Sequence, residues 1–344
     1  YYHVDSMVIK KQGFKQGVTD KCVYVKEVKK GVNMYMDVHV DDKLMAAHRV
    51  HAVQFSKMFQ ETLRTSPLER AESHLGIKFE RPMKGVFQVS IKDKIAEVVK
   101  LVGVNKSAKT PAYTESLSKL SEGSDAFVDV KLFQSIVGIL MWIARFVPEI
   151  SFALGEVASQ LVSPTIKGYE ALKRIVKYLF GRQYVLTFKK TPRGRKEKMA
   201  LVGYVDSDWG GCSDTKRSTT GSCFYLGTNL IHWHRKKQKT VALSSCEAEY
   251  MALCEATSIL LYLRNLLLDF DVTVKLPMVL KVDNQGAMAM AQNGNVTRKV
   301  KHIDLRLYFI LEQVDAGLVR LEYVETKKNR ADGFTKGLNP ELFQ

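Results

Sequence analysis

The chain has 344 residues, of which 46% are hydrophobic and 26% charged. That length predicts two or three domains, and the composition is typical of a soluble globular protein with too many charges for a membrane protein. Lys and Arg total 52 against 36 Asp and Glu, which gives a formal net charge of +16. This excess favours a polyanionic partner such as nucleic acid, and a surplus that only aids solubility is the alternative.

The cysteines and the N-terminus indicate the kind of environment in which the protein occurs and whether the chain is part of a longer one. The five cysteines are an odd number at spacings that match neither a disulfide framework nor a CxxC zinc site, so we expect reduced thiols in an intracellular protein. No apolar run approaches the roughly 20 residues of a membrane span. The start at Tyr1 has neither an initiator Met nor a signal peptide, which indicates a piece of a longer protein.

Apolar periodicity predicts hairpins and then helices in the first 190 residues. In chain order these are a hairpin (21–26 and 33–40), a helix (51–63), a second hairpin (77–80 and 85–89), a polar linker (105–129), and helices at 133–146, 150–161 and 166–179. A basic loop at 189–198 marks the next boundary.

The remaining residues alternate between strand and helix patterns. The prediction is strands at 201–207, 221–226, 230–235 and 240–243, a long helix, a strand at 279–282, helices at 285–292 and 303–316, a strand at 319–324 and a terminal helix. Such an order indicates a mixed sheet with helices packed on it.

Two aspartates end the first of these strands. Asp206 and Asp208 share one face of the strand, so either could reach a metal ion. An ordinary turn role for a strand-end Asp is the alternative.

Two glutamates near the start of the long helix have different predicted roles. Ser244 followed three residues later by Glu247 fits a capping box, which gives Glu247 a structural role. Glu249 instead shares a helix row with Ala252, Ala256, Ile259, Leu263 and Leu266, the face that should pack on the sheet. A carboxylate there is costly unless a cation or a donor receives it, so Glu249 is the better metal-ligand candidate.

Two more aspartates lie at element boundaries. Asp283 ends a strand and precedes a helix, where N-cap duty is as good an explanation as metal binding. Asp332 precedes the predicted terminal helix and could be a first-turn acid favoured by the helix dipole. Together with Asp206 and Glu249 they can converge on one edge of a sheet. Such a cluster suits Mg²⁺, and two ions roughly 4 Å apart can support phosphodiester cleavage.

Basic residues lie beside these acids in the sequence. They are Arg235, Lys236, Lys237 and Lys239 in one segment and Arg298, Lys299, Lys301 and His302 in another. They are candidates for contacts to nucleic-acid phosphates, and a solvated loop is the alternative.

From about residue 1 to 340 the chain resembles the C-terminal part of the Pol polyprotein of copia-type LTR retrotransposons. Five motifs carry the resemblance, in order: Tyr204–Trp209, Ala242–Tyr250, Val282–Ala287, Lys301–Arg306 and Ala331–Lys336. Residues 133–138 and 150–153 match the connection region of such elements.

The resemblance implies a mixed α+β and α/β architecture in three parts. These are a partial reverse transcriptase palm with the start of the thumb (1–104), thumb and connection helices with a basic linker (105–198), and an RNase H-like domain with a mixed five-stranded sheet and flanking helices (199–344). It also implies cleavage of the RNA strand of an RNA/DNA hybrid with two Mg²⁺ ions, or Mn²⁺ in their place. The implied ligands are Asp206, Glu249, Asp283 and Asp332.

In the palm, the resemblance implies that Asp41 and Asp42 are metal ligands, in the turn His39-Val40-Asp41-Asp42 where the family usually has Tyr first. The family's other catalytic Asp lies upstream of this chain, so we expect no DNA synthesis by the chain alone, because polymerisation needs both metals held. A second departure is the lack of a His before Asp332, which implies a difference in product release. A third is Arg145–Glu149 in place of the usual Arg-Pro-Asp, which suggests drift.

Three readings therefore follow. The preferred one is a polyprotein fragment with a complete RNase H site, which acts on an RNA/DNA hybrid beside the remainder of Pol, in the cytoplasm within virus-like particles or in the nucleus. The rivals are an inactive nucleic-acid-binding remnant and a reverse transcriptase subunit completed by a second chain. No membrane partner is expected.

Overall fold

A computed structural model describes residues 2–62, 65–182, 185–190, 198–212, 214–293 and 301–341. The chain forms two compact units. Unit 1 contains residues 1–75 and 259–275, and unit 2 contains residues 76–258 and 276–344. The three-part division expected from the sequence stays a prediction.

Unit 1 is built on an antiparallel sheet of order β1-β2-β3-β4. Its elements are α1 (Tyr2–Lys11), β1 (Lys15–Gln16), β2 (Val23–Lys29), β3 (Val32–His39), β4 (Asp42–Ala46), α2 (Arg49–Thr62) and β5 (Ser73–His74). The predicted hairpin is β2 and β3, which Gly31 joins at a φ of 77°. Apolar side chains from the sheet and from α2, including Phe55 and Phe59, form one core.

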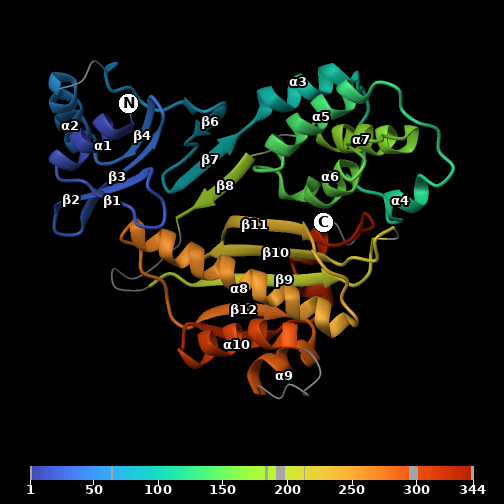
Figure 1. Ribbon diagram of the computed structural model, residues 1–344. Helices are drawn as coiled ribbons and strands as arrows, with labels where there is room; N and C mark the ends of the chain where they lie inside the picture. The colour runs from blue at the N-terminus through green and yellow to red at the C-terminus, as the bar shows by residue number, and fades with distance from the viewer. Residues whose placement is uncertain are drawn as a thin grey trace. The chain divides into compact units, whose positions relative to one another are not determined.

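Unit 2 begins with a small antiparallel sheet and a group of helices (Figure 1). The strands are β6 (Ile77–Glu80), β7 (Val86–Ser90) and β8 (Val185–Lys189), and the helices are α3 (Lys92–Val102), α4 (Leu117–Leu120), α5 (Val130–Ile143), η1 (Pro148–Ile150), α6 (Ser151–Ala158) and α7 (Ile166–Leu179). The helices share a core that includes Phe133, Leu140 and Leu172. Helix α3 was not predicted, although Ile95, Val98 and Val102 have helical spacing.

The second part of unit 2 is a mixed five-stranded sheet of order β11-β10-β9-β12-β13. Its strands are β9 (Leu201–Asp208), β10 (Thr219–Leu226), β11 (Asn229–Lys237), β12 (Met278–Val282) and β13 (Val319–Tyr323). The pairs β9–β10 and β10–β11 are antiparallel, whereas β9–β12 and β12–β13 are parallel. The predicted fold class is confirmed by this arrangement.

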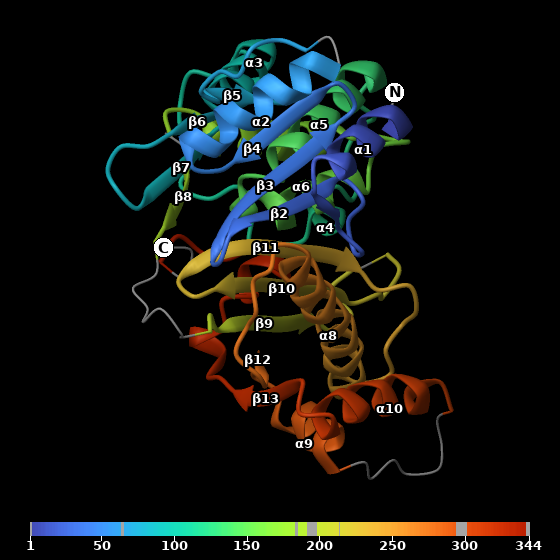
Figure 2. The same ribbon diagram turned by 90° about the vertical axis from the view of Figure 1, so that its left-hand side faces the viewer.

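Three helices accompany the five-stranded sheet, namely α8 (Ser245–Asp269), α9 (Gln285–Asn293) and α10 (Lys301–Asp315). The first part of α8 lies across one face of the sheet, and α9 and α10 lie beside β12 and β13, away from β11 (Figures 1 and 2). Among the described residues α8 alone is long and apolar enough to cross a membrane. Its buried side chains, such as Tyr250 and Leu253, are typical of a core helix.

Two details of the prediction are wrong. Residues 240–243 form no strand. The backbone amide of Gln238 still donates to the Ser218 carbonyl (2.8 Å), while its side-chain amide donates to Thr220 Oγ1 (3.1 Å) and to the carbonyl of Ala248 (2.9 Å), which ties the segment after β11 to α8. The expected terminal helix is replaced by two 3₁₀ turns, η2 (Thr326–Lys328) and η3 (Asp332–Phe334).

Candidate metal centre

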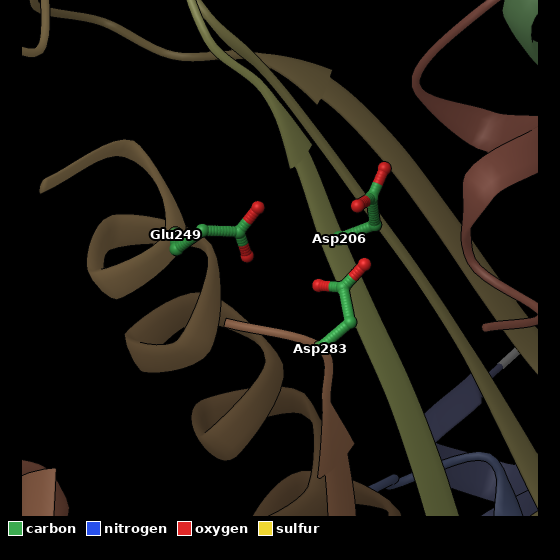
Figure 3. Close-up of side chains that lie close together, drawn as sticks. All are labelled: Asp206, Glu249 and Asp283. Carbon is green, nitrogen blue, oxygen red and sulfur yellow. The ribbon is translucent and has the colours of Figure 1, made fainter. Parts of the chain in front are cut away.

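Three carboxylates converge at one edge of the five-stranded sheet. Asp206, Glu249 and Asp283 each offer an oxygen, and these atoms lie within 4.8 Å of one another. Figure 3 shows Glu249 reaching from α8 toward the strands that carry the two aspartates. The edge is shared because β9 and β12 run parallel, so that both end where α8 begins.

Glu249 is held in the orientation of a ligand. Its side chain is buried, at 6% exposure, and Oε1 accepts a hydrogen bond from the amide of Ser207 at 3.0 Å. The second oxygen, Oε2, is buried and has no hydrogen-bond partner in the part of the chain that the structure describes. A buried carboxylate oxygen without a donor is costly unless a cation or a proton receives it.

Glu247 has the capping role that the sequence predicts. The Ser244 hydroxyl accepts from the Glu247 amide at 3.1 Å, and the Glu247 carboxylate accepts from the amide of Leu243 at 2.7 Å. The carboxylate therefore reaches one residue beyond the N-cap amide of the predicted capping box. Both ends of Glu247 serve the start of α8, whereas Glu249, two residues later, faces the other carboxylates.

The choice between Asp206 and Asp208 is made by burial and neighbours. Asp206 is 3% exposed and belongs to the cluster. The carboxylate of Asp208 lies against Gly211, where an added Cβ would come within 1.6 Å of Oδ2. Asp208 is not part of the cluster found among the described residues.

Asp283 is relieved of the capping role by its neighbour. Asn284 Oδ1 accepts from the amide of Ala287 at 2.9 Å, so Asn284 caps α9. This leaves the carboxylate of Asp283 free to face Asp206 and Glu249. The sequence alone left these two roles open.

Asp332 lies beside the cluster of three, on the turn η3. Its carbonyl is 3.0 Å from the Thr335 hydroxyl, and that hydroxyl also donates a short hydrogen bond to Asp206 Oδ2. The Lys336 ammonium lies 3.1 Å from Asp332 Oδ1. The role of Asp332 as a ligand stays a prediction.

A docked turn, residues 329–336, brings Asp332 to this place. Asn329 is buried, and its amide donates to the carbonyl of Val205 at 2.9 Å, while its Oδ1 accepts from the amide of Ala331 at 3.1 Å. The turn is thereby bonded to β9 next to Asp206. Sequence reasoning assigned no role to Asn329, Thr335 or Lys336.

Gly221 makes room for the docked turn. It pairs with Asp206 in the β9–β10 ladder. A Cβ at Gly221 would lie 2.7 Å from both Phe334 Cβ and Thr335 Cγ2. Only a glycine allows this close approach of the turn to the sheet.

The electrostatics of the cluster are those of crowded, buried acids. Burial, with the charges of Asp206 and Asp283, raises the pKa of Glu249 to about 8. Burial likewise raises the pKa of Asp206 to about 6, against the opposing effects of the Thr335 hydrogen bond and the Lys336 charge. The pKa of Asp332 is raised by burial, and the Lys336 charge opposes this. Like charges and desolvation thus disfavour the fully ionised cluster unless cations bind.

The predicted phosphate contacts differ in their surroundings. Arg235 is largely buried, its side chain 11% exposed, and it pairs with Glu156 of α6 at 3.3 Å, so it stabilises packing between β11 and α6. Lys236 contacts Glu255 at 2.8 Å, and Lys237 donates to Cys212 Sγ at 3.0 Å. Lys239 is exposed. Of the second segment, Arg298 and Lys299 lie outside the described residues, as do the side chains of Lys301 and His302.

The predicted palm aspartates lie in unit 1. Asp41 and Asp42 are exposed at the tip between β3 and β4, where Val40 has a φ of 53°. Within the described ranges they belong to no group of three or more metal-ligating side chains. Their predicted role as metal ligands has no further support in the structure.

The sequence is similar to those of several known proteins. It is 32% identical over 337 residues, 96% of its length, to the retrovirus-related Pol polyprotein from transposon RE1 of Arabidopsis thaliana. It is 29% identical over its full length to the Pol polyprotein from transposon TNT 1-94 of Nicotiana tabacum. The chain belongs to the copia-type retrovirus-related Pol polyproteins. No family model matches it.

This Pol segment spans only part of those proteins, 22% of the RE1 polyprotein and 26% of the TNT 1-94 polyprotein. It is also 32% identical over 224 residues to the uncharacterized mitochondrial protein AtMg00810 of Arabidopsis thaliana, of which it covers 90%.

Two solved structures are also similar to the Pol segment. LC11-RNase H1, isolated from compost, is 16% identical with a TM-score of 0.32, over 40% of the segment and 92% of that chain. The foamy viral protease-reverse transcriptase is 14% identical with a TM-score of 0.47, over 85% of the segment and 36% of that chain.

Proposed function

We propose that the Pol segment hydrolyses the RNA strand of RNA/DNA hybrids at the cluster of Asp206, Glu249 and Asp283. The observation that carries the proposal is the convergence of three carboxylates, from two strands and a helix, on one point. The copia-type family and the five-stranded mixed sheet support it. The net charge of +16 supports a polyanionic substrate.

The residues present fit a divalent cation such as Mg²⁺ or Mn²⁺. All three ligand candidates are carboxylates, the oxygen donors that hard cations take. Within the described residues Glu249 Oε2 has no hydrogen-bond partner, and the raised pKa of Glu249 indicates that its ionised form is poorly compensated. We infer that Asp206, Glu249 and Asp283 hold one ion and that Asp332 contributes to a second.

Bound cations would supply activation of a water molecule and stabilisation of the leaving oxygen of the phosphodiester. The chain's own residues set the geometry for that chemistry. The Ser207 amide fixes Glu249, and the Thr335 hydroxyl fixes Asp206. Because both contacts come from packed elements, the ligands need little rearrangement on binding.

The test is cleavage of an end-labelled RNA/DNA hybrid in the presence of Mg²⁺. The wild-type Pol segment should cut the RNA strand, and Asp283→Asn should lower the rate at least 100-fold. The matched control is Glu247→Gln, which alters the capping glutamate two residues from Glu249 and should keep most of the activity. If wild type binds the hybrid without cutting it, and Asp283→Asn binds equally well, the chain is the inactive nucleic-acid-binding remnant instead.

We expect no primer extension by the Pol segment alone. Two-metal polymerisation needs a complete carboxylate set, and in the described part of unit 1 Asp41 and Asp42 have no third metal-ligating partner. The expectation would be contradicted if wild type incorporates labelled nucleotides on a primed RNA template and Asp42→Asn abolishes this incorporation. Extension only after addition of a second Pol-derived chain would support the two-chain reading.

A further inference from the structure

Lys336 places a fixed positive charge beside the carboxylate cluster. Its ammonium lies 3.1 Å from Asp332 Oδ1, and the Asp332 side chain is only 17% exposed. Although burial lowers the pKa of Lys336, the charges of Asp206, Asp332 and Asp283 raise it above its ordinary value. The ammonium therefore interacts with acids from three elements of the fold.

The position of Lys336 follows from the docked turn. Thr335, the preceding residue, is fully buried and hydrogen-bonded to Asp206, and Gly221 lets the turn approach the sheet. Asn329 ties the other end of the turn to β9. With both ends held, Lys336 stays within reach of Asp332, unlike an ordinary surface lysine.

The two sides of the cluster consequently differ in charge. On the Glu249 side, Oε2 is buried and has no hydrogen-bond partner among the residues that the structure describes. On the Asp332 side, Oδ1 likewise has no well-aligned hydrogen bond, but the Lys336 ammonium lies 3.1 Å from it. The Lys336 charge also acts on Asp206, but its direct ion pair is with Asp332. A first divalent ion at Glu249 therefore replaces no ion pair, whereas an ion at Asp332 must take the place of the Lys336 ammonium.

We propose that Lys336 is a resident counter-cation of the metal centre, and that a divalent ion binds at Asp332 only by displacing its ammonium. The inference rests on the proposed function, in which the cluster holds divalent ions. It makes the two ion positions unequal, one strong and one weak in the absence of substrate. Lys336 is thus a positioning residue that sets the affinity of the second ion.

The test is a Mn²⁺ titration without nucleic acid, in which electron paramagnetic resonance counts the free ions. Wild type should bind one ion strongly and a second weakly. Lys336→Gln removes the repulsion between the ammonium and the second ion, and should strengthen the weak binding by roughly tenfold. Lys336→Arg keeps the charge and should leave the second ion weak.

The matched control is Lys328→Gln, the same chemical change in the nearby turn η2. Lys328 pairs with the exposed Glu325 at 3.1 Å, away from the cluster, so its variant should bind Mn²⁺ like wild type. Asp332→Asn should abolish the weak ion and keep the strong one. Unchanged or weakened second-ion binding in Lys336→Gln would overturn the proposal.

Thermal unfolding gives an independent measurement. In EDTA, Lys336→Gln should unfold at a lower temperature than Lys328→Gln, because its acids repel one another without compensation, and Mn²⁺ should remove that difference. If Mn²⁺ does not remove the lower unfolding temperature of Lys336→Gln, the ion pair of Lys336 with Asp332 is merely structural. If the Mn²⁺ results are as expected but wild type fails to cut hybrids, the proposed function is wrong, whereas the proposed role of Lys336 as counter-cation still stands.

Discussion

Gly221 and Thr335 are in contact across the interface between β10 and the docked turn. A Cβ at Gly221 would lie 2.7 Å from Thr335 Cγ2, and Thr335 in turn holds Asp206. One hydrogen atom in place of a side chain thus lets the turn that carries Asp332 dock beside a metal-ligand candidate.

Gly221→Ala should therefore push the turn away from the sheet. Overpacking of this kind costs about 1 to 3 kcal/mol of stability, and cleavage should fall with the displacement of Thr335 and Asp332. Gly138→Ala is the control, because Gly138 lies in α5 with nothing within 4 Å of the added Cβ. That variant should be neutral or slightly more stable in urea unfolding. Equal unfolding midpoints for the two variants would contradict the packing argument.

Asn284 is expected to support the metal centre indirectly through its cap on α9. Asn284→Ala should cost about 1 kcal/mol of stability and weaken Mg²⁺ binding, because Asp283 would no longer be held at the end of β12. Asn284→Ser keeps an accepting oxygen at the cap and should recover most of both losses. Isothermal titration with Mg²⁺ and thermal unfolding measure the two effects. Full metal affinity in Asn284→Ala would show that Asp283 needs no such support.

The metal-free protein should lose stability as the pH rises. The folded-state pKa values of Asp206 and Glu249, about 6 and about 8, lie above their ordinary values of 3.8 and 4.5. Across that window the folded state binds more protons than the unfolded state, so the free energy of unfolding falls with increasing pH. In EDTA the melting temperature should drop between about pH 5 and about pH 8.5, and saturating Mg²⁺ should flatten the profile.

Glu249→Gln provides the control for this pH dependence. The variant removes the group with the higher pKa, so its EDTA profile should be flatter than that of wild type. Its melting temperature should also respond less to Mg²⁺. A wild-type melting temperature that rises toward pH 8.5 in EDTA would contradict the assigned pKa directions.

Arg235 should matter for stability more than for hybrid binding. Removal of one partner of a largely buried ion pair costs about 3 to 5 kcal/mol when the other charge is left buried, and Arg235→Ala leaves Glu156 in that state. Lys236→Ala, which breaks an exposed pair, should cost less than about 1 kcal/mol. Urea unfolding compares the two.

Binding of a fluorescent hybrid in Ca²⁺ separates the structural role from the surface role. Lys239→Ala should weaken this binding modestly and in a salt-dependent manner, because Lys239 is exposed and follows the end of β11. Arg235→Ala should bind the hybrid like wild type when it is measured without urea, at a temperature where the variant stays folded. A larger binding defect in Arg235→Ala than in Lys239→Ala would favour the original phosphate-contact prediction.

Much of the fold follows from local patterns in the sequence. The strand patterns in 201–207 and 221–226 predict β9 and β10, and the helical row that contains Glu249 predicts the buried face of α8. The predicted strand at 240–243 is wrong, since β11 ends at Lys237 and the side chain of Gln238 ties the following segment to Thr220 and Ala248. Side-chain bonds between distant residues leave no periodic signal in the sequence.

For the metal centre, the sequence by itself determined which acids are candidates and distinguished Glu249 from Glu247, because helical spacing and capping are local properties. Only the tertiary structure decided that Asp206, Glu249 and Asp283 converge, and that the turn with Asp332 docks beside Asp206. These outcomes depend on contacts between segments far apart in the chain, such as the bond of Asn329 with Val205, which are 124 residues apart. Such contacts arise from the packing of whole elements, which no single segment encodes.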